Sequence, residues 1–301
     1  MPTPHHGEGE AQQRVLRGFR IAVGLSLMVL VIESIGAFFS RSLSLTVDAV
    51  HNVPDVAAFA ISYAALASTR DGSSDRFTFG THRLEVFAGI VNGAIVLGAG
   101  LVFGYEAVDS LVRATTFAGP VDAAWLLLAA VPTLGLRAVN LRVLAPGSVR
   151  SSDLNLRSVA VHLASDIAIT GALLVAGGLL LVRPDLAWVD PLAALVIAGV
   201  LVREAVPLLR EGADVLTERT PRGISIDAIS KSTLAVPGVA EVHDIHVWSV
   251  CSSLVCMTAH VTVRDMSLQE SIDVVESLRA RMEREFGILH ATFQVECPPA
   301  A

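Results

Sequence analysis

The chain has 301 residues, of which 52% are hydrophobic and 17% are charged, and its mean hydropathy is +0.60. This composition is too apolar for an ordinary soluble enzyme, and the apolar residues stand in long runs. The formal net charge is −7, and the segment from about residue 211 onward holds 13 acidic and 7 basic residues, a net charge of −6. Such an acidic tail argues against a nucleic-acid partner and is compatible with cation binding.

Six apolar runs are long enough to cross a membrane as helices, at about 19–40, 43–68, 84–112, 122–144, 158–182 and 187–209. The first 18 residues are polar, and no small-residue cleavage site follows the first run, so we predict an uncleaved first helix. The sequence thus predicts an N-terminal arm over 1–18, a six-helix transmembrane domain over 19–210 and a separate domain over 211–301.

Basic residues are distributed unequally between the two sides of this predicted domain. Twelve arginines fall in the arm, after the second and fourth runs and at the end of the sixth, whereas three fall on the opposite side. We place Arg137 in the connection that follows the fourth run. Because positive charge stays on the cytoplasmic side, both termini are expected in the cytoplasm. Arginine supplies all basic residues but Lys231, which suggests a GC-rich bacterial genome and hence an inner membrane.

Two copies of the pattern His-x-x-x-Asp lie inside apolar runs, as His51/Asp55 and His162/Asp166. Positions i and i+4 share a helix face, and ionisable residues in apolar helices are costly, so four of them need a common reason. A single such residue could make an interhelical hydrogen bond, but two matched copies favour one tetrahedral metal site, with zinc as the fitting ion. Asp48 lies on the face of His51, where it could accept the imidazole N–H or cap the helix.

The tail alternates between helix and strand patterns. We expect a helix over 224–235, strands over 239–250 and 253–264 joined by a tight hairpin, an amphipathic helix over 267–286 and a strand over 289–296. This αββαβ order predicts a small α+β domain with its helices on one face of a sheet. The three cysteines, Cys251, Cys256 and Cys297, form no C-x-x-C pattern and indicate no disulfide framework.

Several stretches resemble the cation diffusion facilitator family of zinc transporters, in the order of that family and from about residue 20 to the end. They are LTVDAVHNVPDVAA, RFTFGTHRLEVFAGIVNG, VAVHLASDIAITGALL, ADVLTERTPRG and GVAEVHDIHVWSV. The resemblance implies a homodimeric six-helix antiporter, embedded in membrane lipid, with a ferredoxin-like, metallochaperone-like cytoplasmic domain. It implies export of Zn²⁺ in exchange for H⁺, with Cd²⁺ or Co²⁺ as alternative substrates. The transport site then falls on His51, Asp55, His162 and Asp166.

The same resemblance implies a metal site in the tail at His243, His260 and Glu296, the alternative being ordinary surface histidines. Cys297 and the pair His5-His6 could complete its shell, although His5-His6 could equally be only part of a disordered arm. In a regular strand His243 and His246 face opposite sides, so they share a site only if the strand is bulged.

The resemblance touches two further regions of the chain. A weaker metal site could involve Asp75 and His82, in the connection before the third helix. Arg83 and Asp214 match positions that pair in relatives at the junction of membrane domain and tail, where they hold the dimer together. The alternative for Arg83 and Asp214 is that they are two ordinary interfacial charges.

Two other classes of protein deserve comparison. An intramembrane metallohydrolase needs an open coordination position and a general base, but four protein ligands close the site and no H-E-x-x-H motif occurs. A membrane-anchored metal sensor would use only the tail and leave the buried His/Asp pairs unexplained. We therefore expect a transporter and not an enzyme.

Overall fold

The structure is a computed structural model that describes residues 6–67, 80, 82–115, 119–148, 154–251 and 254–297. Within its helices, the side chains of residues 6–16, 19, 55, 58–67, 85, 144–148 and 154–162 lie outside the description. The chain divides into two compact units, one made of residues 1–71 and 91–207 and the other of 72–90 and 208–301. Each unit is described separately below.

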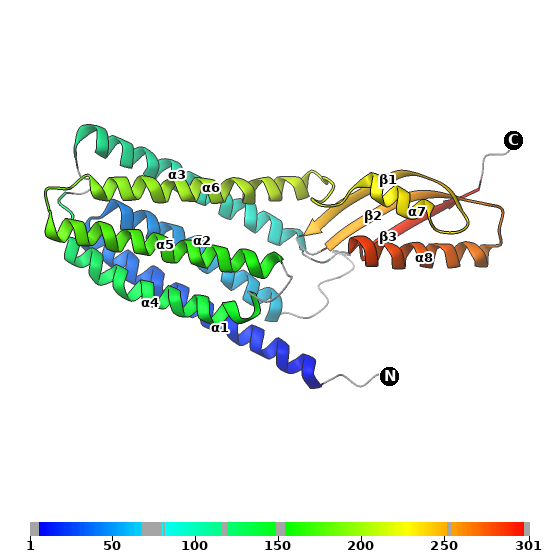
Figure 1. The fold of residues 1–301 in the computed structure, drawn as a ribbon, viewed down its shortest axis with the longest axis horizontal. Coiled ribbons are helices and arrows are strands. Elements are labelled where there is room, and N and C mark those ends of the chain that lie inside the picture. The colour runs from blue at the N-terminus through cyan, green and yellow to red at the C-terminus, as the bar shows by residue number, and fades with distance from the viewer. Residues whose placement is uncertain are drawn as a thin grey trace. The chain divides into compact units, whose positions relative to one another are not determined.

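Six long helices follow one another in the first three-quarters of the chain (Figure 1). They are α1 (His6–Ser40), α2 (Leu43–Ala67), α3 (His82–Arg113), α4 (Ala123–Ser148), α5 (Leu154–Val182) and α6 (Val189–Leu216). Among the described residues, five of the six, all but α2, are long and apolar enough to cross a membrane. The predicted helix count is confirmed, and α1 starts at His6, well inside the segment predicted as an arm.

Helix packing in the first unit brings α2 and α5 close to each other. Helix α1 packs against α2 and α4, α4 packs against α5, and α2 approaches α5. Leu126, Leu173 and Leu201, from α4, α5 and α6, belong to one buried apolar cluster. Large apolar residues also lie on the outside, such as Phe38, which is 78% exposed. An outer surface of this kind suits a lipid environment, because lipid chains solvate apolar side chains.

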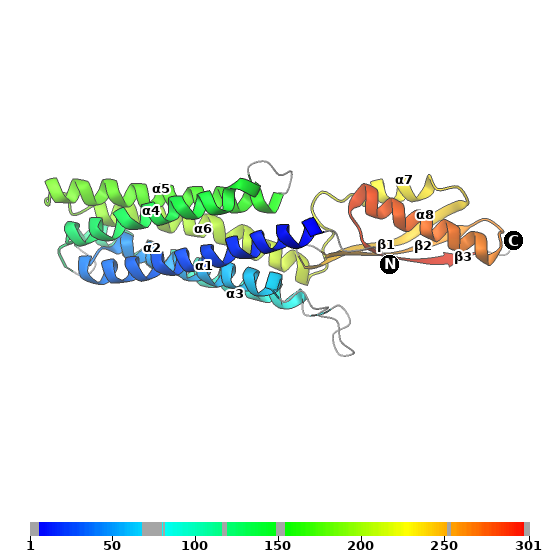
Figure 2. The ribbon, with the colours of Figure 1, turned by 90° about the horizontal axis from the view of Figure 1, so that it is seen from below.

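The tail folds as predicted into a small α+β domain. Its elements are α7 (Ile226–Leu234), β1 (Val239–Cys251), β2 (Leu254–Val263), α8 (Leu268–Phe286) and β3 (His290–Glu296). The sheet order is β1-β2-β3, with β1 antiparallel and β3 parallel to β2. Figure 2 shows α7 and α8 on the same face of this sheet. The parallel pairing follows from α8, which carries the chain back along the sheet between β2 and β3.

Core residues alternate with outward residues along β2. Met257, Ala259 and Val261 are buried in the core of the domain, so that His260 faces the side of the sheet away from the helices. Cys251 and Cys256 are buried thiols, and burial, with a smaller contribution from Cys251, raises the pKa of the Cys256 thiol. These two cysteines therefore behave as small core residues.

Candidate metal centre

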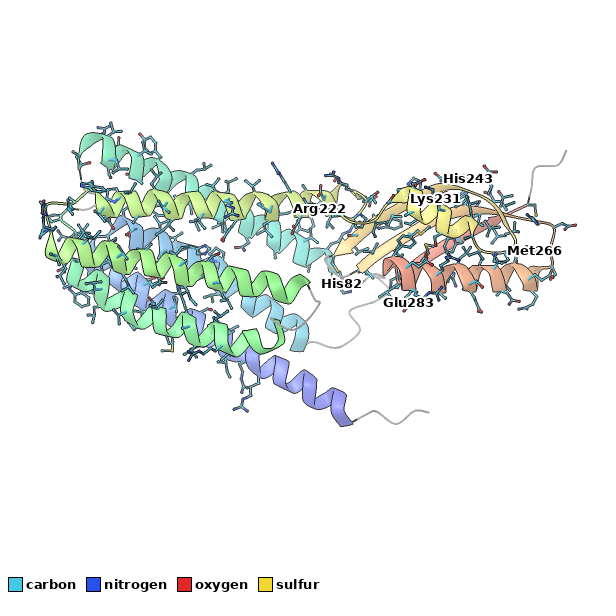
Figure 3. All side chains as sticks on the ribbon, viewed as in Figure 1. His82, Arg222, Lys231, His243, Met266 and Glu283 are labelled. Atoms are coloured by element: carbon cyan, nitrogen blue, oxygen red, sulfur yellow. The ribbon has the colours of Figure 1, made fainter. Side chains whose placement is uncertain are left out.

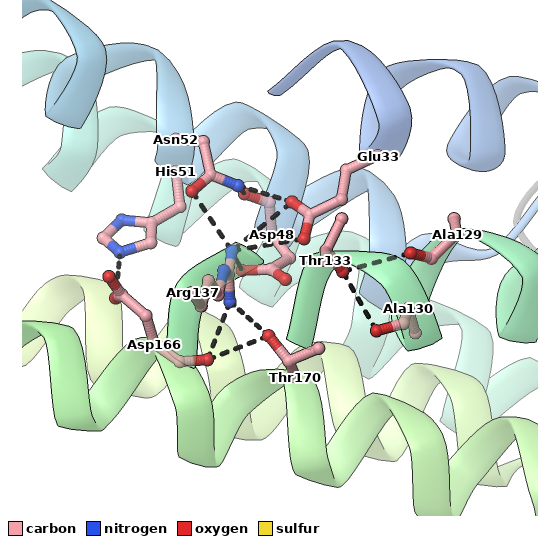
Figure 4. Close-up of polar contacts among 10 residues, drawn as sticks. All are labelled: Glu33, Asp48, His51, Asn52, Ala129, Ala130, Thr133, Arg137, Asp166 and Thr170. Atoms are coloured by element: carbon pink, nitrogen blue, oxygen red, sulfur yellow. Dashed lines mark hydrogen bonds and ion pairs between the residues drawn. The ribbon is translucent and has the colours of Figure 1, made fainter. Parts of the chain in front are cut away.

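The first His-x-x-x-Asp copy contacts the second across α2 and α5. His51 Nε2 lies 3.6 Å from Asp166 Oδ1, and both side chains are buried (Figure 4). Two ligand atoms on a tetrahedral zinc ion lie about 3.4 Å apart, given Zn–N and Zn–O bonds of about 2.0–2.2 Å. The observed separation is therefore within a few tenths of an ångström of the edge of a zinc coordination tetrahedron.

The other two predicted ligands lie one helical turn away on the same helices. Asp55 follows His51 by four residues in α2, and His162 precedes Asp166 by four in α5, while the side chains of Asp55 and His162 lie outside the described residues. Figure 1 shows α2 and α5 running in opposite directions. In antiparallel helices that meet at His51 and Asp166, one turn forward in α2 and one turn back in α5 lead towards the same end of the pair. The backbones of Asp55 and His162 therefore lie at the same height along the helices, one turn from the His51–Asp166 contact. A site of all four residues stays a prediction.

An ion-pair network borders the His51–Asp166 contact, and the sequence analysis did not find it. Arg137 of α4 lies with Nη2 3.1 Å from Asp48 Oδ1 and 3.3 Å from Glu33 Oε1, and all three residues are buried. Asn52 donates a hydrogen bond to Glu33 and accepts one from Arg137 at 3.1 Å. The partner of Asp48 in this network is thus the Arg137 guanidinium. The predicted hydrogen bond between Asp48 and the His51 imidazole stays a prediction.

The placement of Arg137 in a connection was wrong, since the residue is 3% exposed and lies within α4. The error came from counting charges alone, because a buried arginine and a loop arginine contribute equally to that count. Glu33 gave a usable signal, since it is an acidic residue in the middle of an apolar run. Two carboxylates and one guanidinium leave the network with one net negative charge if both carboxylates are ionised, which favours a cation nearby.

A cavity of about 10 Å³ lies beside this network. That is about the volume a single water requires. The Oδ1 of Asn140, a lining residue, is buried and has no hydrogen-bond partner among the described residues. The cavity lining consists of Ser26, Val29, Asn52, Arg137, Asn140, Leu163 and Asp166. The cavity therefore gives water a place next to Asp166.

A second candidate site lies on the open face of the tail sheet. Three residues each place one possible ligand atom within 4.8 Å of the other two, namely His243, His260 and Glu296. His260 Nδ1 is 2.8 Å from Glu296 Oε1, and His243 Nε2 is 3.3 Å from Glu296 Oε2. Strand pairing causes this arrangement, because His243 is the direct partner of His260 and β3 runs beside β2. Figure 3 labels His243, which belongs to β1 of the tail.

A bulge in β1 brings a further carboxylate, that of Asp244, to the edge of this three-residue cluster, and the sequence analysis did not single it out. The register shifts between His243 and His246, and Asp244 has a left-handed φ of 51°. Asp244 Oδ2 lies 3.7 Å from His260 Nε2, and Asp244 Oδ1 lies 2.9 Å from His246 Nε2. In a regular strand Asp244 would face away from His243, so only the bulge places both near His260.

Of the remaining predicted ligands, the structure describes the side chains of Cys297 and His82 only. Cys297 is exposed and lies outside the three-residue cluster that the described part of the tail forms. His82 is exposed at the start of α3. His5, Asp75 and the side chain of His6 lie outside the described residues, so their predicted roles stay predictions.

The predicted pairing of Arg83 with Asp214 does not occur among the described residues of this single chain. Arg83 Nη2 lies 3.2 Å from Glu218 Oε1, and Asp214 pairs with Arg219 at 3.1 Å and with Arg222 at 3.4 Å. A turn after α6 brings Arg219 and Arg222 back to Asp214, and so supplies nearer partners than Arg83. Arg83 lies at the start of α3, and Asp214 lies near the end of α6.

Comparison with known proteins identifies the family of the chain. The family described as cation efflux transmembrane domain matches residues 19–217, and the cation efflux protein, cytoplasmic domain, matches residues 221–297. The metal cation efflux system protein CzcD of Cupriavidus metallidurans is 30% identical over 284 residues, which cover 94% of this chain and 87% of that protein. The cadmium, cobalt and zinc/H(+)-K(+) antiporter of Bacillus subtilis is 29% identical over 297 residues, which cover 97% and 91%.

A further relative is named for zinc alone. The zinc transporter ZitB of Escherichia coli is 28% identical over 299 residues, which cover 99% of this chain and 91% of that protein. Relatives of this kind are transporters, and the matched domains run through almost the whole chain. The chain therefore belongs to the cation efflux family, the cation diffusion facilitators, as an integral membrane protein of a family that exports divalent metal cations.

Proposed function

We propose that this protein exports Zn²⁺ from the cytoplasm in exchange for protons, through a site of His51, Asp55, His162 and Asp166. The observation that carries the proposal is the His51 Nε2–Asp166 Oδ1 separation of 3.6 Å between two helices with the same motif. Two imidazoles and two carboxylates are donors that suit tetrahedral zinc, whereas Mg²⁺ and Mn²⁺ favour sites of oxygen alone. The names of two relatives, which include zinc, support this choice, and one of them adds cadmium and cobalt.

Proton exchange follows from the chemistry of the ligands. An imidazole binds a metal only when its nitrogen is free of a proton, so that protons and zinc compete for His51 and His162. The cavity beside Asp166 has room for about one water, which places a proton carrier next to the site. Helices that rock around the site would open it first to the cytoplasm and then to the opposite side.

The tail is proposed to bind Zn²⁺ at His243, His260 and Glu296, whose ligand atoms lie close together. The protein acts as a homodimer, which the match to a cytoplasmic domain of the dimeric type supports. The excess of arginine in the N-terminal arm and in the connections on the same side supports cytoplasmic termini.

The test is metal flux into proteoliposomes whose lumen is more acidic than the outer buffer. Zinc should enter while protons leave, which an indicator for zinc and one for luminal pH record together. His51→Ala and Asp166→Ala should reduce zinc entry to the level of empty vesicles. Asp185→Ala and His246→Ala, which remove exposed side chains of the same types, should transport as the unchanged protein does. Wild-type-like zinc entry by either His51→Ala or Asp166→Ala would refute the site.

A further inference from the structure

The guanidinium of Arg137 is divided between the two helices that carry the proposed ligands. Towards α5, Nη1 donates to the backbone carbonyl of Asp166 at 2.7 Å and to Thr170 Oγ1 at 2.5 Å. Towards α2, Nη2 donates to Asp48 Oδ1 and Asn52 Oδ1, each at 3.1 Å. One rigid, planar group therefore contacts both ligand-bearing helices at once, as the dashed lines in Figure 4 show.

The contacts lie at the level of the metal site. On α5, the carbonyl that Arg137 binds belongs to Asp166, which is itself a proposed ligand. On α2, Asp48 precedes His51 by three residues and Asn52 follows it directly. A shift of either helix relative to the other would break hydrogen bonds to a charged donor, which are stronger than bonds between neutral groups.

Two buried carboxylates hold Arg137 in place. Asp48 and Glu33 both lie within 3.3 Å of Nη2, and the arginine cannot lose its proton under any ordinary condition. Withdrawing the guanidinium would leave buried acidic groups without their charged partner, which is strongly unfavourable. The acidic side chains thus hold the guanidinium of Arg137 in place. Its hydrogen bonds from Nη1 to α5 and from Nη2 to α2 then fix the position of each helix relative to the guanidinium.

We propose that Arg137 is a positioning residue that sets the separation of α2 and α5 at the transport site, and thereby the preference for zinc over larger ions. This inference rests on the proposed zinc transport function. Cation selectivity in proteins depends on ligand type and on geometry, and here the ligands are suitable for several divalent metals. A separation of 3.6 Å held by the arginine suits zinc, whereas the larger Cd²⁺ needs its ligands farther apart.

The experiment compares Arg137→Lys with the unchanged full-length protein in proteoliposomes, and measures KM and Vmax for Zn²⁺ and for Cd²⁺. Lysine keeps the charge beside Asp48 and Glu33 but lacks the planar fork that reaches α2 and α5 together. The KM for zinc should rise by about 10- to 100-fold, the usual effect of removing a group that orients metal ligands. The KM for cadmium should rise less, so that the preference for zinc over cadmium falls by about tenfold.

Two further variants make the outcome decisive. Thr170→Val removes one contact of Nη1 at nearly constant volume and should shift the KM and the preference in the same direction, by less. Arg183→Lys, at an exposed pair with Asp185, is the matched control and should change neither. A purely structural role would lower the amount of folded protein and Vmax without altering KM or metal preference.

The result that would overturn the inference is an unchanged KM for zinc and an unchanged zinc-to-cadmium preference in folded Arg137→Lys. If that variant does not fold, the same result in Thr170→Val overturns it. The proposed function fails separately, namely when the unchanged protein itself moves no zinc.

Discussion

Asp190, in the first turn of α6, caps the start of α2 from a distance of almost 150 residues along the chain. Its Oδ2 accepts the backbone N–H of Leu43 at 2.7 Å, and its Oδ1 accepts the N–H of Ser44 at 3.3 Å. The hydroxyls of Ser42 and Ser44 both donate to Oδ1 at 2.5 Å. The first N–H groups of a helix have no partner within it and attract negative charge, so a buried carboxylate is a strong cap for the helix that carries His51.

We expect Asp190→Asn to destabilise the membrane unit by about 4–6 kcal/mol. If the amide oxygen keeps the three donors that now bind Oδ1, the amide NH₂ faces the N–H of Leu43, and a buried unsatisfied donor costs about 1–3 kcal/mol. Each of the three remaining bonds becomes neutral and loses about 1 kcal/mol. For a unit of about 200 residues, this sum corresponds to a fall in Tm of about 10–20 °C.

The assay is the fraction of detergent-solubilised full chain that stays soluble and monodisperse after heating, with hydrogen exchange of the α2 amides as the local readout. Asp185→Asn is the matched control, because Asp185 forms an exposed pair with Arg183 at 2.8 Å and should leave Tm almost unchanged. A fall in Tm of less than about 3 °C for Asp190→Asn, or unchanged exchange of the first α2 amides, would contradict this account of the cap.

Two predictions concern the tail. Glu296→Gln should weaken zinc binding to the tail of the full chain by about 10- to 100-fold in an equilibrium titration, because Glu296 contacts both histidines, whereas Glu241→Gln, at an exposed position of β1, should bind as before. Ser267→Ala should destabilise α8 by about 1 kcal/mol, seen as faster hydrogen exchange of its first turn, because Ser267 and Glu270 form a capping box. Hydrogen bonds from Ser267 lower the pKa of Glu270, so the stabilisation by this carboxylate exists above its unfolded pKa and is lost as pH falls through the lower folded pKa. Protection of the first turn of α8, which is the exchange rate corrected for its intrinsic pH dependence, should therefore fall in acid in the unchanged protein, and an equal fall in Glu270→Gln would count against this assignment.

Much of the architecture was accessible from local patterns. Apolar length identified the helices of the membrane unit, because a membrane-spanning helix needs about 20 apolar residues whatever its neighbours are. Period-two alternation and turn residues identified the strands and helices of the tail within a few residues. The spacing of four residues in His51/Asp55 and His162/Asp166 put each pair on one helix face, and the structure brings His51 and Asp166 together.

Partner choice between distant segments could not be obtained in this way. Arg137 was counted as a loop charge, and Glu33 was not singled out, because nothing in either run states which buried charge meets which. Asp244 was not singled out, because in a regular strand it faces away from His243, and only the bulge brings it near His260. The pairing of Arg83 with Asp214 was inferred from relatives, whereas Glu218 is the residue that Arg83 contacts here.

The sequence by itself determined the elements, their order and the residue types available for metal binding, since helix and strand periodicity and ligand chemistry are local properties. Only the tertiary structure decided the rotation and depth of each helix. The rotation and depth of the helices place Asp190 at the start of α2 and place Arg137 in contact with both α2 and α5. The physical reason is that an apolar helix surface fits its neighbours in many ways, whereas a buried charge is tolerated only where partners from other helices compensate it.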